Sequence, residues 1–243
     1  MCARIVWDQT GSKLYQTGVD RVVLYPHKDD GSSGTGVGWN GVTAIDESPE
    51  GGEPNPIYAN NKKYLEMISP EEFGLGLTAY TYPDEWEECD GSRSIVPGVT
   101  IRQQNRRSFD LTYRTLVGND IIGTDYGYIL HLVWNGKASP SERSYATVND
   151  SPEAMELSWD ITTTKTELVG YQSTACLNIE SAKLDEDGKA ALKTLEDILY
   201  GTEQAEPRMV TLAEAIQILS GSSEPEEGSD PAPVDPEAEG GEG

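Results

Sequence analysis

The sequence is poor in several residue types on which common protein functions depend. Its 243 residues include three Cys, two His and two Phe, and 18 basic residues stand against 42 acidic ones. Three widely spaced cysteines predict free thiols in a reducing compartment, not a disulfide framework. The formal net charge of −24 argues against nucleic-acid binding by phosphate neutralisation and against binding to anionic membranes. The N-terminus also lacks the apolar core of a signal peptide, so we expect synthesis in a cytoplasm.

Catalytic and metal-binding patterns are equally scarce. The glycine cluster at 31–38 lacks the Lys-Ser/Thr ending of a phosphate loop, and no cysteine pair has zinc-ligand spacing. The acidic cluster at 84–90 follows Pro83 and fits a short helix better than a calcium loop. Acidic neighbours should raise the thiol pKa of Cys89. We therefore predict no enzyme, no metal and no cofactor. Paired carboxylates acting on a sugar leave no sequence signature, so a carbohydrate-binding β-sandwich or glycosidase is the alternative.

Most of the chain is predicted to form strands. We expect strands at 22–25, 100–104, 108–117, 126–134, 155–162 and 174–181, with a hairpin turn at 105–107. Alternation is clearest at 155–162, where Met155, Leu157, Trp159 and Ile161 should face a core. His131 alternates with apolar residues in its strand, which predicts a hydrogen-bonded or interface histidine. The expected fold class is mainly β, an antiparallel β-sandwich or barrel with a flanking helix.

Three parts of the chain differ in composition. Residues 1–183 form the predicted β-sandwich domain, 184–220 a helical C-terminal segment, and 221–243 a disordered acidic tail. Asp185 is a suitable N-cap for a helix over Glu186–Tyr200, and Thr211 opens a capping box before a second helix. The tail holds eight acidic residues and no Lys or Arg, and it lacks the apolar residues that would offset its ordering entropy.

One stretch concentrates basic residues in this acidic chain, namely Arg93, Arg102, Arg106, Arg107 and Arg114. Two interpretations remain open. In one, the arginines cover a solvated hairpin face; in the other, they form a surface that meets an acidic patch on a neighbouring copy.

Several segments, in order, resemble the major tail proteins of long-tailed bacteriophages. The first is WDQTGSKLYQTGVDRVVLYP at 7–26, followed by GVTIRQQ at 98–104, SFDLTYRT at 108–115 and DYGYILHLV at 125–133. The similarity spans residues 5 to about 170. It leaves out the helical segment and the acidic tail.

The resemblance implies a structural virion protein of the phage tail. Such proteins form hexameric rings that stack into a tube, and a continuous barrel of strands lines the lumen through which the genome passes without specific binding. A tape measure protein and a tail terminator are the implied partners. A related subunit that makes a single ring, in tail completion or the baseplate, is a further alternative. The flanking helix of the family would correspond to the helix that starts at Asp185.

Two sets of residues are candidates for roles in such a tube. Polar faces of the strands at 108–115 and 155–162 are expected to line the lumen, with Arg114 paired to a neighbouring carboxylate; these candidates are Asp110, Thr112, Arg114, Glu156, Ser158 and Asp160. Residues 46–69 are expected to reach from one ring to the next, with Tyr58, Tyr64 and Leu65 as apolar anchors.

Overall fold

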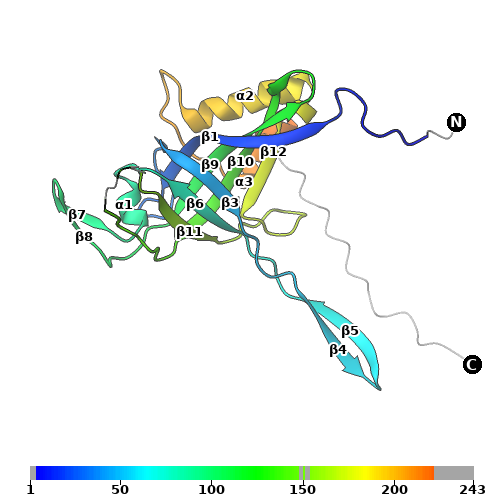
Figure 1. The fold of residues 1–243 in the computed structure, drawn as a ribbon, viewed down its shortest axis with the longest axis horizontal. Coiled ribbons are helices and arrows are strands. Elements are labelled where there is room, and N and C mark those ends of the chain that lie inside the picture. The colour runs from blue at the N-terminus through cyan, green and yellow to red at the C-terminus, as the bar shows by residue number, and fades with distance from the viewer. Residues whose placement is uncertain (1–3, 148–149, 151–153, 222–243) are drawn as a thin grey trace, which may run out of the picture.

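Antiparallel strands dominate the computed structural model, which describes residues 4–147, 150 and 154–221 (Figure 1). The elements in chain order are β1 (Leu14–Pro26), β2 (Val37–Gly38), β3 (Val42–Glu47), β4 (Pro54–Ala59), β5 (Lys62–Ile68), β6 (Gly74–Ala79), α1 (Trp86–Cys89), β7 (Arg93–Val96), β8 (Val99–Ile101), β9 (Phe109–Asn119), β10 (Gly123–Ala138), β11 (Leu157–Thr163), β12 (Cys176–Glu180), the 3-10 turn η1 (Ser181–Lys183), α2 (Glu186–Tyr200) and α3 (Leu212–Ser220). The predicted fold class is confirmed. No helix among the described residues is long and apolar enough to span a membrane.

One large sheet organises the molecule. Its strand order is β2-β1-β9-β10-β11-β6-β3, and β12 pairs with β10 beside this path. On the side away from β9, β10 pairs with two strands in succession. Residues 129–133 pair with β12, and residues 136–138 pair with β11. Between these stretches the register against β9 shifts at Asn135, whose φ is +54°. Such an irregularity bends a strand, and here it separates the strands that continue the sheet from those that fold across it.

The two halves of the sheet pack face to face on an aromatic core. Leu24 of β1 and Leu111 of β9 join Leu77 of β6 and Trp159 of β11 in one buried cluster. Trp39, Trp86 and Trp159 meet at ring-centroid distances of 4.6 to 5.6 Å, within the range in which tilted aromatic pairs attract. The described strands thus form a folded-over sheet and do not close into a barrel.

A helical layer covers the opposite face of β1, β9 and β10. Side chains of β1 point alternately to the two sides of the sheet. Val22 and Leu24 face the aromatic core, and Val23 and Tyr25 face the helices. Leu192, Leu195 and Leu199 form the buried stripe of α2, and the Tyr25 hydroxyl donates to the Leu199 carbonyl at 2.7 Å. The segment 184–220 therefore shares a hydrophobic core with the sheet.

Both predicted caps are present. The Asp185 side chain accepts a hydrogen bond from the Gly188 amide, and the Thr211 hydroxyl accepts one from the Glu214 amide. Helix α2 spans the predicted residues, and a short helix α1 follows Pro83 as expected. The predicted tail at 221–243 lies, except for Gly221, outside the described residues.

The predicted hairpin around residues 105–107 is wrong. β8 pairs with β7 through a turn at Pro97 and Gly98, whereas β9 pairs with β1 and β10. The Pro-Gly pair is a stronger turn signal than the polar residues at 105–107 because Gly98 adopts a positive φ of 83°. Met155 also differs from expectation, since it precedes β11 and its surface is 46% exposed.

Candidate assembly surfaces

The exposed side of β3, β6 and β11 is a polar face made of small side chains. Leu157, Trp159 and Ile161 of β11 are buried, so Ser158, Asp160 and Thr162 point outward, as the alternation predicted. In the adjoining strands, Gly76 pairs with both Asp160 and Asp46. Two carboxylates therefore flank a glycine in one cross-strand row. We call this surface the polar face; it comprises Ala44, Asp46, Gly74, Gly76, Thr78, Ser158, Asp160 and Thr162. Glu156 lies immediately before β11 and is also exposed.

The corresponding prediction for β9 is wrong. Asp110 and Thr112 were expected on an open polar face, but they are only 4% and 0% exposed. Their side of the sheet is the one covered by α2 and α3, because the neighbouring strands present Val23, Tyr25, Leu130 and Leu132 to the helices. Alternation within a strand separates its two faces, but it does not show which face later elements cover.

Asp110 and Arg114 find their partners within the chain, whereas the buried Thr112 hydroxyl forms no hydrogen bond among the described residues. Asp110 lies 3.0 Å from His27 Nε2 and accepts a hydrogen bond from the backbone N–H of Asn135 at 2.8 Å. Arg114 donates two hydrogen bonds to the Asp20 carboxylate at 2.6 and 2.7 Å, so the carboxylate partner expected for Arg114 lies on β1 of the same chain. These hydrogen bonds lower the pKa of Asp20. Asp110 and Arg114 therefore have structural roles, and Thr112 is buried on the same side of the sheet.

A hairpin formed by β4 and β5 projects from the body (Figure 1). All its residues are exposed, although they include large apolar side chains. Ile57 pairs directly with Leu65, and Met67 lies two residues further along β5, so the three share one face. Tyr58 and Tyr64 are 68% and 73% exposed. An isolated two-stranded hairpin is marginal in water, and its apolar residues have no partner in the described part of this chain. Contact with another ring stays a prediction.

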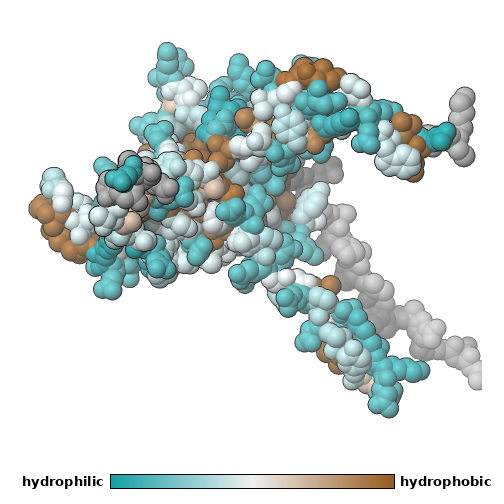
Figure 2. All heavy atoms as spheres, in the orientation of Figure 1, coloured by the Kyte–Doolittle hydropathy of each residue, from teal (hydrophilic) through white to brown (hydrophobic). Residues whose placement is uncertain are grey.

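Two further exposed apolar segments were not anticipated from the sequence. The β7–β8 hairpin exposes Ile95, Val96, Val99 and Ile101, and Figure 2 shows hydrophobic residues gathered at this end of the molecule. The extended N-terminal segment exposes Ile5, Val6 and Trp7 by 62% to 75%. The only available sequence signal for the first was a pair of β-branched runs around Pro97-Gly98. Solvent-exposed apolar groups of this extent mark interaction surfaces.

Two strand edges are open among the described residues. The first half of β1, from Leu14 to Gly18, pairs with β9 on one side, while β2 reaches only Val23 and Leu24 on the other. Strand β12 pairs with β10 alone. These edges lie on opposite sides of the β1-β9-β10-β12 portion of the sheet. Their unpaired N–H and C=O groups can accept a strand from another chain.

The buried histidine has a structural explanation. The ring nitrogens of His131 lie 2.9 Å from Thr115 Oγ1 and 2.9 Å from Asn178 Oδ1, and the ring stacks on Tyr113. Burial lowers the pKa of His131.

The Cys89 thiol has a raised pKa of about 12. Burial is the main cause of this shift, and the acidic neighbours that the sequence analysis considered contribute less. Among the described residues, no group of three His, Cys, Asp or Glu side chains could hold a metal ion.

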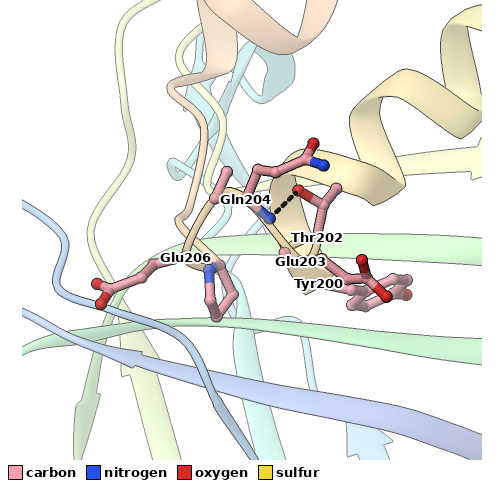
Figure 3. Close-up of a pocket in the computed structure, with 8 residues that line it drawn as sticks. Tyr200, Thr202, Glu203, Gln204 and Glu206 are labelled. Atoms are coloured by element: carbon pink, nitrogen blue, oxygen red, sulfur yellow. Dashed lines mark hydrogen bonds between the residues drawn. The ribbon is translucent and has the colours of Figure 1, made fainter.

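An open hollow of about 420 Å³ lies beside the loop between α2 and α3 (Figure 3). It is lined by residues 200–207, and within it the backbone N–H of Gln204 donates to the Thr202 hydroxyl at 3.3 Å. A second loop bond runs from the Thr202 amide to the Ala205 carbonyl. The hollow is therefore accounted for by the turn that ends α2 at Gly201.

No protein-family model matches the chain, and no curated protein matches it. Among solved structures, similarity extends to a chain of the sheath-tube complex of an extracellular contractile injection system, PVC, in its extended state. Identity is 13%, the TM-score is 0.33, and the match covers 66% of this chain and 88% of the other. A chain of the PVC sheath/tube terminator matches at 11% identity and TM-score 0.33, over 68% of this chain and 97% of the other.

Proposed function

We propose that this chain is a tube-forming structural subunit of a phage tail, which assembles into hexameric rings stacked around a passage for the genome. The observation that carries this proposal is the projecting β4–β5 hairpin, which exposes apolar side chains from an otherwise acidic protein. Tyr58, Tyr64 and Leu65 anchor it on the next ring. The resemblance of residues 5 to about 170 to major tail proteins supports the same role.

Assembly around the ring uses different parts of the molecule. The open edges of β1 and β12 lie on opposite sides of one sheet. One neighbouring subunit can therefore pair at the β1 edge and another at the β12 edge, and such contacts need no two-fold axis. Head-to-tail contacts of this kind generate closed rings when their rotation closes. Tape measure and terminator proteins would then contact the tube.

The polar face is the surface we assign to the lumen. Its residues Ser158 and Asp160, with Glu156 beside them, combine short side chains with negative charge. A negative wall repels DNA phosphates over about 8 Å at physiological ionic strength. Asp110, Thr112 and Arg114 are no longer candidates because the helices cover their side of the sheet.

Electron microscopy of the purified full chain tests this function. Stacked rings or tubes are expected. A variant in which residues 53–69 are replaced by a short Gly-Ser linker should keep its circular dichroism spectrum and form at most single rings. A monodisperse monomer of the full chain at all concentrations would contradict the proposal and leave the carbohydrate-binding alternative to be tested. Single rings of the unaltered chain would instead identify a completion or baseplate subunit.

A further inference from the structure

Three arginines line one cleft of this acidic protein. Arg102, Arg106 and Arg143 surround a cleft of about 570 Å³ together with Asp90 and Tyr145. Arg102 and Arg106 lie in the segment between β8 and β9, and Arg143 lies in the segment after β10. Arg102 and Arg106 belong to the concentration of arginines in the sequence, whereas Arg143 joins them only in the folded chain.

The positive charge of the cleft exceeds its negative charge. Arg143 pairs with Asp90 at 2.6 Å, and both side chains are largely buried at 15% and 12% exposure. This pair accounts for the one carboxylate that lines the cleft. In the described part of the chain, Arg102 and Arg106 form no ion pair within 4.0 Å, unlike Arg107, which contacts Asp29 and Glu88. Neither guanidinium group is therefore paired with a carboxylate among the described residues, and Arg102 donates to the Tyr145 hydroxyl instead.

Arg106 has a buried donor without an acceptor. Its Nε atom is inaccessible to water and forms no hydrogen bond in the described structure. The side chain lies over Gly91, where an added Cβ would be 3.1 Å from Arg106 Cγ. A buried N–H group without a partner costs free energy, and a shift of the Arg106 side chain toward an acceptor in the cleft would recover it. The cleft also favours a negative oxygen at its rim, because a hydrogen bond from Arg102 lowers the pKa of Tyr145.

We propose that this arginine cleft binds a carboxylate-rich peptide, and that residues 222–243 of the same copy of the chain supply it. That segment contains eight Asp and Glu residues and no Lys or Arg. Arginine guanidinium groups bind carboxylates through paired, charge-assisted hydrogen bonds. The proposal does not depend on tube formation.

Reach and linkage favour this segment over other anions. It begins after Gly221, and about 22 residues extend to roughly 75 Å at full length. A compact domain of this size is only about 45 Å across. Covalent attachment gives a tethered ligand an effective concentration of about millimolar, which offsets repulsion by the rest of the acidic surface. A free polyanion such as DNA has no such advantage.

A full-length variant tests the cleft directly. In this variant, the eight acidic residues of 222–243 are changed to Asn or Gln, so that its own tail does not compete. A fluorescent peptide with the native sequence of 222–243 is then titrated by anisotropy. We expect saturable binding that weakens as salt is added. Arg102→Ala with Arg106→Ala should weaken binding on the order of tenfold or more. Arg102→Lys with Arg106→Lys, which keeps the charge, should restore only part of it.

Matched controls decide the outcome. Lys189→Ala with Lys193→Ala removes the same charge from α2 and should leave peptide affinity within about twofold, a difference smaller than one typical hydrogen bond contributes. Circular dichroism and the melting temperature establish that each variant is folded, and Arg102→Ala alone, at an exposed residue, provides a variant without effect on the core. Absence of binding, or equal loss in the lysine control, overturns the proposal. So does tighter binding of a DNA oligonucleotide of the same charge, which would make the cleft a phosphate site.

Discussion

Aspartate residues are exposed on one side of this sheet and buried on the other, so replacing them has different effects. Asp160 of β11 and Asp46 of β3 lie on the open polar face, where both pair with Gly76 of the strand between them. Asp110 is buried beneath the helices, where it contacts His27 and the Asn135 amide. Replacing the first pair changes a surface, whereas replacing Asp110 removes a buried acceptor.

The double variant Asp46→Lys with Asp160→Lys should fold normally and convert the polar face into a phosphate-binding surface. We expect tubes of this variant to retain double-stranded DNA in a sedimentation assay, with retention that falls steeply as salt is added. Unaltered tubes should not retain DNA. If the substituted tubes remain as inert toward DNA as the unaltered ones, these carboxylates do not face the passage.

His131 should make stability depend on pH. Burial lowers its pKa in the folded state below the usual value of about 6.5. The unfolded chain therefore binds more protons as pH falls, and stability is complete above about pH 6.5 and declines below it. Asp20 and Glu214, whose pKa values are also lowered, lose their contribution at more acidic pH.

We expect the free energy of unfolding of His131→Gln to fall less between about pH 7 and about pH 5 than that of the unaltered chain. Urea denaturation at each pH measures it. Parallel pH profiles for the two proteins would show that another group titrates in this range.

At the scale of elements, the helical layer depends on the side chains of α2. Leu195 is fully buried against the sheet, and it lies between Leu192 and Leu199 on the same stripe. Leu195→Ala should lower the free energy of unfolding by about 2–5 kcal/mol. Asp185→Ala, which removes only the N-cap, should cost about 1 kcal/mol. Chemical denaturation of both variants checks this order, and a larger effect of the cap would contradict it.

The projecting hairpin should affect assembly without affecting folding. Its anchors have no contacts to lose within the chain because they are exposed. Tyr58→Ser, Tyr64→Ser and Leu65→Ser together should leave the melting temperature nearly unchanged and prevent tube growth. Val169→Ser with Tyr171→Ser, at similarly exposed apolar positions in a loop, is the control and should form normal tubes. Equal assembly of both variants would rule out an anchoring role for the hairpin.

The whole molecule carries a formal charge of −24, so copies repel one another at long range. Salt shortens the reach of this repulsion, from about 30 Å at 0.01 M to about 3 Å at 1 M. We therefore expect the tube fraction, measured by sedimentation, to rise with ionic strength. Binding of the acidic peptide to the arginine cleft should show the opposite dependence. A tube fraction that falls with salt would mean that charge pairing drives assembly.

Local features were predictable because they depend on neighbouring residues. The sequence specifies the period-2 alternation of 157–162, the caps at Asp185 and Thr211, and the stripe of leucines in α2. It also specifies the exclusion of long apolar helices and the concentration of arginines in an acidic chain. Each of these features depends on the chemistry and spacing of side chains that are close together in the sequence.

Tertiary structure decided which surfaces are covered and which remain open. The same alternation occurs in β9 and β11, yet only β11 keeps its polar side exposed, because α2 and α3 pack on β9 from a distance of many residues along the chain. Arg143 joins Arg102 and Arg106 in one cleft for the same reason. Burial depends on contacts between segments remote in sequence, and the periodicity of a single strand contains no information about them.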